Sequence, residues 1–279
     1  MKKIIITWAN WMLWWDFLIS KNNDFDIIWY DKNYLNILDK KNIEEIIEKE
    51  KPDIIINTAW YTNVENAQKN EKILEVNYLW VKNLSQICKK YEVDLITFST
   101  DYVFDWNKKN SYDINDKKNP INNYGKSKAK WEELWKQYNE NIIIIRTSWL
   151  FWWNKNSKNF VNKILNLSKE KKQLEIIYDQ YWNPTYTIDL INSTFEIIKD
   201  IEKNRWKIFH ITNSSKRKNS WYNFALKIKK IKKLNIKIKK IKTKDFFSDA
   251  KRPKNSRLKN NYIVLRSWRK ALKEYIKKN

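Results

Sequence analysis

The chain has 279 residues and a formal charge of +24 at pH 7, with 56 Lys and Arg against 32 Asp and Glu. This length suffices for one large domain or two closely joined ones. The single cysteine, Cys88, excludes an internal disulfide and a cysteine-based metal cluster, and the single histidine, His210, argues against Ser-His-Asp chemistry because it stands in a strand-like run. The chain has no apolar run of membrane-spanning length, and its charged start leads into a strand rather than a signal peptide. We therefore expect a cytoplasmic protein without a membrane partner.

The positive charge could indicate nucleic acid as a partner. However, the lysines are spread over the whole chain among many Asn and Ile residues, as biased base composition would also produce. In the densest segment, 227–244, apolar residues at helical spacing give way to alternating Ile and Lys. We favour a helix that leads into an edge strand with solvated lysines over a nucleic-acid-binding arm.

Glycine and tryptophan occur in unusual numbers, 1 and 17. An average chain of this length has about twenty glycines, so the two counts together match a normal glycine complement and a few tryptophans. The codon UGA is read as tryptophan in some genetic codes and as glycine in others. We therefore predict that most of these tryptophans are glycines in the native protein, and Trp106, Trp182 and Trp206 stand at turn signals where glycine is favoured. The alternative is a protein with a Trp-rich surface for stacking.

The N-terminal half alternates strands and helices. Ile4–Ile6 form a run typical of a buried parallel strand. Trp8, Trp11 and Trp14 follow at the spacing of the three glycines in a dinucleotide-binding turn. Those glycines let the backbone approach a pyrophosphate, whereas an indole fills the space that the phosphates need. The motif as written is therefore blocked. Further strands are predicted at 26–30, 53–57 and 93–99, and helices at 12–20, 43–51, 65–91 with a break near Asn77, and 123–137. This order predicts a parallel sheet with right-handed crossovers.

Polar residues follow the predicted strands, at the sheet edge where ligands bind in open α/β folds. Asp31 lies about twenty residues after the turn, where a carboxylate can bind the adenosine ribose. The neighbouring lysine could instead tolerate a 2′-phosphate, so both NADH and NADPH stay open. Thr100 ends the fourth strand, and the polar loop 106–119 follows it. Tyr124 and Lys128 are four residues apart on the next helix, where an ammonium close to a phenol lowers its pKa.

Eight motifs stand in order along the chain: T-W-A-N-W-M-L-W, N-T-A-W-Y-T, S-T-D-Y-V-F-D-W, Y-G-K-S-K, R-T-S-W-L-F, N-F-V, D-Q-Y-W-N-P-T and A-K-R-P-K-N-S. The set resembles the extended short-chain dehydrogenase/reductases, and within them the dTDP-4-dehydrorhamnose reductase family, from Lys2 to about Tyr275. This family has or tolerates glycine at Trp8, Trp11, Trp14, Trp29, Trp80, Trp106, Trp131, Trp152, Trp182 and Trp206. It has tryptophan at Trp149, Trp221 and Trp268, and the resemblance leaves Trp15, Trp60, Trp135 and Trp153 undecided.

The resemblance implies an α/β fold: a Rossmann-type doubly wound parallel sheet with a smaller, partly intercalated α/β substrate domain. The NAD(P)-binding domain would span 1–150, completed by about 185–211, and the substrate domain 151–184 and 212–279. In the second half we expect helices at 159–169, 187–201 and from Ser267, and strands at 174–178 and 207–211. The implied reaction is reduction of the C4 keto group of dTDP-4-dehydro-L-rhamnose by NADPH or NADH, to give dTDP-L-rhamnose for polysaccharide biosynthesis. The resemblance also allows a homodimer.

The resemblance also implies a role for individual residues. Tyr124 would donate a proton to the ketone oxygen, Lys128 would hold the nicotinamide ribose and lower the Tyr124 pKa, and Thr100 would hydrogen-bond the carbonyl. The cofactor would be bound by Trp8, Asn10, Trp11, Met12, Leu13, Asp31, Asp39, Ala59 and Tyr61 together with Lys128. Trp149 and Arg252 would join Thr100 in binding the substrate, Trp149 against the sugar and Arg252 at the diphosphate. Asp16 is a candidate for a Mg²⁺ ion, or else a plain surface charge.

Two other functions stay open at this stage. The same fold could serve as a non-catalytic regulatory subunit, although the intact set of Thr100, Tyr124 and Lys128 argues against that. The chain could also reduce or epimerise another nucleotide sugar, because the choice of sugar depends on loop geometry.

Overall fold

The computed structural model describes residues 1–7, 13, 16–17, 20, 22–60, 62–70, 72–152 and 159–278, with the backbone alone for 72–77, 135 and 136. The predicted turn residues Trp8, Trp11 and Trp14 and most of the predicted helix at 12–20 lie outside the described residues.

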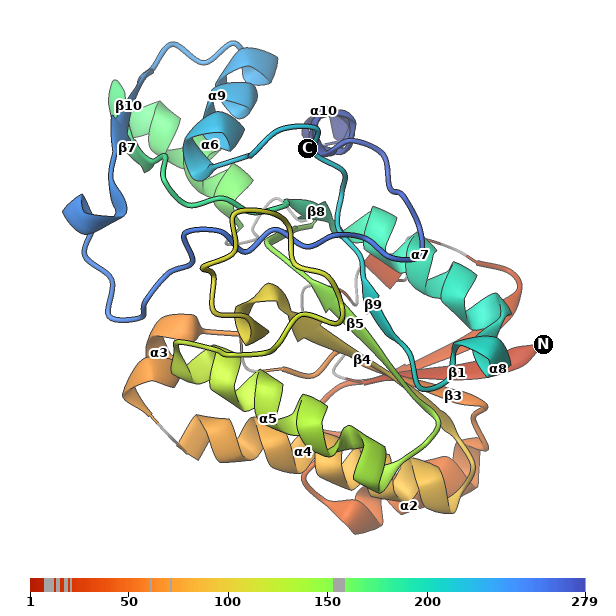
Figure 1. The fold of residues 1–279 in the computed structure, drawn as a ribbon. Helices are drawn as coiled ribbons and strands as arrows, with labels where there is room; N and C mark the ends of the chain where they lie inside the picture. Colours follow the sequence, from red (N-terminus) through yellow and green to blue (C-terminus); the bar gives the residue numbers. More distant parts are fainter. Residues whose placement is uncertain are drawn as a thin grey trace.

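A six-stranded parallel sheet forms the centre of the molecule (Figure 1). Its strands are β1 (Lys2–Thr7), β2 (Phe25–Tyr30), β3 (Ile54–Asn57), β4 (Asp94–Thr100), β5 (Ile142–Thr147) and β9 (Ile208–His210), in the order β2-β1-β3-β4-β5-β9. The chain starts inside the sheet, adds β2 on one side and the remaining strands on the other. This is the doubly wound arrangement predicted from the sequence, and the prediction is confirmed.

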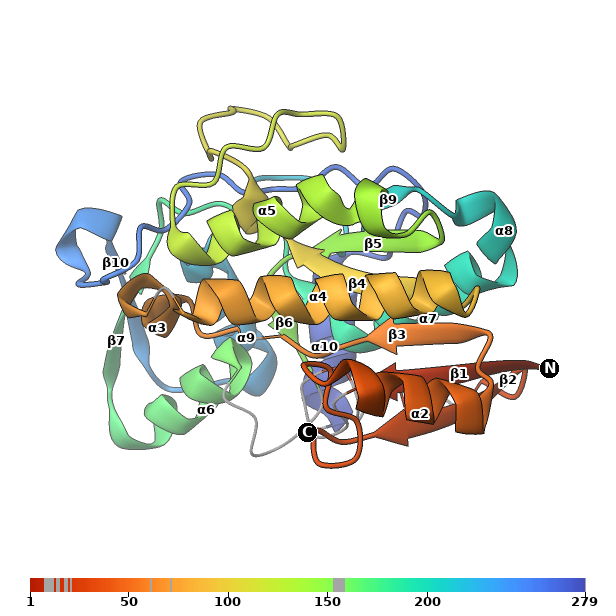
Figure 2. The same ribbon diagram turned by 90° about the horizontal axis from the view of Figure 1, so that it is seen from below.

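Helices cover both faces of the sheet (Figures 1 and 2). One face carries α2 (Lys40–Glu50), α4 (Lys72–Lys90) and α5 (Asn123–Tyr138), and the other carries α7 (Thr187–Lys199) and α8 (Ile201–Asn204). Side chains alternate along a strand, so Ile5 packs in the core of the first face while Ile4 and Ile6 pack in that of the second. Cys88 lies buried in the first core, as predicted, and burial raises the pKa of its thiol.

A smaller unit packs beside the sheet. It contains α6 (Phe160–Glu170), β7 (Gln173–Ile177), α9 (Trp221–Lys232), β10 (Lys237–Ile241) and α10 (Trp268–Lys278), and two short strands, β6 (Leu150–Phe151) and β8 (Thr185–Tyr186), pair near its junction with the sheet. The lysine-rich segment forms the end of α9 and the strand β10, which pairs with β7 and exposes Lys237, Lys239 and Lys240. The predicted helix and edge strand are therefore confirmed.

Some predicted element boundaries are wrong. The stretch 65–91 forms two helices, α3 (Val64–Lys69) and α4, and the break lies at Asn70 rather than near Asn77. Asn70 ends α3 because it adopts extended dihedrals, with φ −131° and ψ 101°. The single helix predicted at 187–201 is divided into α7 and α8 at Asp200, and β5 was not predicted as a separate element.

Among the tryptophans that the structure describes, three have a left-handed backbone. The φ angle is 64° at Trp106, 66° at Trp206 and 47° at Trp149. Glycine adopts this region at no steric cost, whereas a residue with a Cβ is strained there. Two of these three positions are ones at which the sequence analysis places glycine.

Candidate active site

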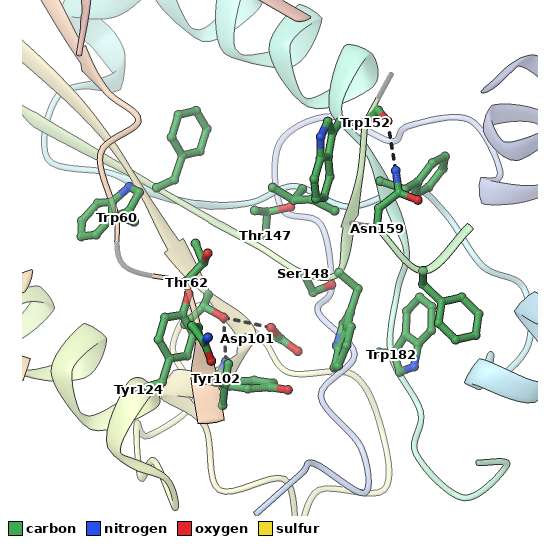
Figure 3. Close-up of a pocket in the computed structure, with 18 of the residues that line it drawn as sticks. Trp60, Thr62, Asp101, Tyr102, Tyr124, Thr147, Ser148, Trp152, Asn159 and Trp182 are labelled. Atoms are coloured by element: carbon green, nitrogen blue, oxygen red, sulfur yellow. Dashed lines mark hydrogen bonds between the residues drawn. The ribbon is translucent and has the colours of Figure 1, made fainter. Parts of the chain in front are cut away.

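A cavity of about 570 Å³ opens at the carboxyl edge of the sheet (Figure 3). It is lined by six residues predicted to be functional, Leu13, Thr100, Tyr124, Lys128, Trp149 and Arg252. Thr100 is the last residue of β4, and Trp149 follows β5. Tyr124 and Lys128 lie on α5. The carboxyl ends of neighbouring parallel strands thus bring together residues that are far apart in the sequence.

Thr100 lines the cavity at the end of β4. Its hydroxyl accepts a hydrogen bond from the Tyr102 amide at 3.2 Å and donates one to Asp101 Oδ1 at 3.1 Å. These bonds cap the short helix η1 (Asp101–Val103) and fix the threonine rotamer. The hydroxyl also interacts with the Tyr124 phenol, and the Tyr102 and Tyr124 rings meet edge to face at 5.7 Å.

The expected lowering of the Tyr124 pKa by Lys128 is not found. The Tyr124 pKa is raised instead, first by burial and then by the negative charge of Asp101, while the Thr100 hydrogen bond opposes the rise. The Lys128 ammonium is directed elsewhere: it donates to the Phe98 carbonyl at 3.2 Å. Burial lowers the pKa of Lys128, although the nearby Glu132 carboxylate favours the charged form.

The indole of Trp60 covers Lys128. The ammonium nitrogen lies 2.7 Å from the centroid of the Trp60 ring, so no other group fits between them. The Trp60 ring is stacked on Trp131 at 5.5 Å. Both indoles are buried, and neither Nε1 has a hydrogen-bond partner within the described part of the chain. Polar groups in a native core are nearly always satisfied, so this tryptophan pair is an unusual feature.

The single glycine, Gly125, is where helix α5 meets η1. A Cβ added at this position would lie 2.1 Å from the Tyr102 carbonyl oxygen and 3.0 Å from Pro120 Cβ. No side chain fits there, and the close contact places Tyr124 directly beside the end of β4. The helix N-terminus is therefore positioned by the absence of a side chain.

A buried network of charged residues, which the sequence analysis did not predict, joins α5 to strands β4 and β5 next to the cavity. Glu132, one turn after Lys128, accepts hydrogen bonds from Arg146 at 2.7 and 3.0 Å and from the Ser99 hydroxyl. Arg146 also contacts His210 Nε2 at 3.2 Å, and burial followed by the Arg146 charge lowers the His210 pKa to about 3. His210 is thus a neutral strand residue. The one sequence signal for this network was a charged residue, Arg146, directly after the four isoleucines of β5.

The other two predicted substrate residues, Trp149 and Arg252, line the same cavity as Thr100. The Trp149 ring packs against other aromatic rings. The centroid distances are 4.0 Å to Trp221, 5.3 Å to Trp182 and 6.1 Å to Tyr102. Arg252 donates from Nη1 to the Tyr102 hydroxyl at 3.1 Å and forms an ion pair with Glu65. An aromatic face and a guanidinium thus border one volume, which suits a sugar joined to an anionic group.

The predicted cofactor residues have different outcomes. Trp8, Asn10, Trp11, Met12 and Tyr61 lie outside the described residues, and Leu13 lines the cavity. Asp31 follows β2 and accepts the Asn33 amide at 2.7 Å. Asp39 caps α2, where it accepts the amides of Lys41 and Asn42. Ala59 is buried beside the cavity-lining residues Thr58 and Trp60.

The magnesium prediction at Asp16 has no support from the described residues. Asp16 is fully buried and accepts a hydrogen bond from the Thr187 hydroxyl, at the start of α7. Within the described ranges no group of three His, Cys, Asp or Glu residues could hold a metal ion. Its interior position is also unlike the surface charge that was the alternative.

Comparison with known proteins identifies the family. The RmlD substrate binding domain model matches residues 1–279. The dTDP-4-dehydrorhamnose reductase of Aggregatibacter actinomycetemcomitans is 32% identical over 272 residues, which cover 92% of this chain and 91% of the relative. A crystal structure of a dTDP-4-dehydrorhamnose reductase from Clostridium acetobutylicum has a TM-score of 0.91 at 31% identity, and covers 99% of this chain and 98% of its own. Another, from Bacillus anthracis in complex with NADP, has a TM-score of 0.90 at 29% identity, with 100% and 99% covered. The protein described here belongs to the RmlD substrate binding domain family.

Proposed function

We propose that the protein is an oxidoreductase that reduces the C4 keto group of dTDP-4-dehydro-L-rhamnose to dTDP-L-rhamnose with NADPH or NADH. The observation that carries the proposal is the convergence of Thr100, Tyr124 and Lys128 at the carboxyl edge of the sheet, in one cavity with Trp149 and Arg252. The named relatives, among them the NADP complex from Bacillus anthracis, support the same activity.

The chain's own groups have separate tasks in this reaction. The bound dinucleotide supplies the hydride. Tyr124 supplies the proton to the ketone oxygen, and the Thr100 hydroxyl hydrogen-bonds that oxygen as negative charge develops. Burial keeps the Tyr124 phenol protonated before the reaction. The ring of Trp149 gives the apolar face of the hexose a surface to pack against.

One residue conflicts with a bound dinucleotide. The polar ends of β1, β3 and β4 fit such a ligand, but the Trp60 indole covers the ammonium of Lys128 that would hold the ribose. Glycine at position 60 would remove this obstruction. We therefore extend the proposed replacement of tryptophan by glycine to position 60, which the sequence motifs alone left undecided.

The first test is Tyr124→Phe in the native protein, which we propose carries glycine at positions 8, 11, 14 and 60. We expect loss of dTDP-sugar reduction with cofactor affinity within a few fold, because the phenylalanine ring keeps the packing and lacks the acidic hydroxyl. Tyr138→Phe is the matched control: it removes a hydroxyl from the same helix, where that hydroxyl contacts Tyr78 at 3.0 Å away from the cavity. The measurement is NADPH consumption with dTDP-4-dehydrorhamnose. Normal turnover in Tyr124→Phe would refute the mechanism.

The remaining expectations stay proposals. They are a cytoplasmic enzyme, a homodimer and the domain division given above. Within the described ranges no helix is long and apolar enough to span a membrane.

A further inference from the structure

The Glu65 carboxylate on α3 makes several hydrogen bonds to the loop 248–252. Glu65 Oε1 accepts hydrogen bonds from the Arg252 guanidinium and from the Ser248 hydroxyl at 2.9 Å, and Glu65 Oε2 accepts the Ala250 amide at 3.0 Å. Burial opposes ionisation of this carboxyl, but its hydrogen-bond donors outweigh that effect and lower the Glu65 pKa. The carboxylate therefore stays charged and bridges two segments that are 187 residues apart in the sequence.

The contacts of Arg252 leave part of its guanidinium available to a ligand. Nη2 binds Glu65, Nη1 binds the Tyr102 hydroxyl at 3.1 Å, and Nε approaches Ser248 at 3.5 Å. A guanidinium has five N–H donors, so three contacts leave one N–H on each terminal nitrogen. Donors on both terminal nitrogens allow a guanidinium to bind a phosphate with both nitrogens. Both Glu65 and Arg252 line the cavity.

The same loop is also tied to the catalytic helix. Asn122 Nδ2, two residues before Tyr124, donates to the Lys251 carbonyl at 3.1 Å. Arg252 is thus held relative to the proton donor through its neighbour in the chain, and relative to α3 through Glu65. A second ion pair, between Lys69 and Asp249 at 2.9 Å, joins α3 to the loop without touching Arg252, and it is solvent-exposed.

We propose that Glu65 is a positioning residue that orients Arg252 toward the diphosphate of the nucleotide sugar. The inference rests on the proposed function, in which Arg252 takes that role. Glu65 holds one side of the guanidinium and so directs the other side to the ligand, which limits the rotamer entropy lost on binding. Lys163 lines the same cavity and adds positive charge to it.

The test measures binding of thymidine diphosphate by calorimetry, which requires neither cofactor nor turnover. Arg252→Ala is expected to raise Kd by about a hundredfold and Glu65→Ala by about tenfold, as for lost hydrogen bonds to charged groups. Adding Glu65→Ala to Arg252→Ala should give no further loss, because Glu65 acts through the arginine. Glu65→Gln, which retains one acceptor oxygen, should recover part of the affinity. The control Lys69→Ala should bind as the unaltered protein does, since exposed ion pairs contribute little.

Three results would overturn the inference. Unchanged or tighter binding by Glu65→Ala would mean that the carboxylate competes with the diphosphate. An equal loss in the Arg252→Ala background would mean that Glu65 only holds the loop. Unchanged binding by Arg252→Ala would remove the arginine from the site. If thymidine diphosphate binding follows the expected pattern but dTDP-4-dehydrorhamnose is not reduced, the proposed function fails and the role of Glu65 stands.

Discussion

The backbone at Trp206 leads to a prediction about which residue the native chain carries there. Trp206 follows helix α8 with φ 66°, and Trp29 lies in strand β2 with an ordinary backbone. The two side chains are similarly exposed, 45% and 47%. We propose comparing Ala and Gly at each position, because both substitutions remove the indole and only the presence of a Cβ then differs.

The expected difference in stability between the Gly and Ala variants has opposite signs at positions 206 and 29. A Cβ in the left-handed region costs about 1 kcal/mol, so Trp206→Gly should be more stable than Trp206→Ala by about that amount. Glycine in a strand costs about 0.5 to 1 kcal/mol relative to alanine, so Trp29→Gly should be less stable than Trp29→Ala. Urea unfolding midpoints measure both differences, provided that the slopes agree. Greater stability of Trp206→Ala than of Trp206→Gly would refute the argument that this backbone is shaped for glycine. Peptide mass spectra of the protein from its own cells then identify the native residue directly.

Two further predictions concern buried charges. Burial raises the Asp101 pKa from 3.8 to about 7, so the Asp101 contribution to the free energy of unfolding falls as pH rises from 4 to 7, whereas the lowered His210 pKa contributes with the opposite sign. Asp101→Asn removes the first contribution alone, so it should make the slope of the free energy of unfolding against pH more positive in urea titrations at several pH values. An unchanged slope would contradict the raised pKa. Glu132→Gln leaves the buried Arg146 without its carboxylate partner, so it should lower the free energy of unfolding by about 3 kcal/mol. An effect below about 1 kcal/mol would show that water or His210 stabilises the arginine in place of the carboxylate.

Local patterns were sufficient to predict a parallel sheet, although not its strand β5, and to single out Tyr124 and Lys128. Ile4–Ile6 required a buried strand, and the order of strands and helices then left few topologies. Tyr124 and Lys128 were found because their spacing places both on one face of a helix. Their relative positions in the cavity, however, depend on Gly125, whose need for close contact with Tyr102 appears only in three dimensions.

Contacts between distant segments could not be predicted in the same way. Arg146 meets Glu132 across 14 residues and His210 across 64, and no periodicity in the sequence relates these positions. Glu65 and Arg252 are farther apart still, and neither residue type indicates its partner. The pKa of Tyr124 failed as a prediction for a related reason: helical spacing gives two residues the same face, but it does not give the direction of a long lysine side chain.

Trp149 and Trp206 show why backbone strain alone does not identify a replaced glycine. Both have positive φ, yet the Trp149 indole packs against three aromatic rings in the cavity, whereas the Trp206 indole is half exposed. Strain is tolerated where the side chain has a function. Trp60 is the reverse case: its indole is buried and covers Lys128, and its own N–H has no hydrogen-bond partner among the described residues. A tryptophan that covers the ammonium proposed to hold the cofactor ribose is best explained as a position where the working enzyme has no side chain.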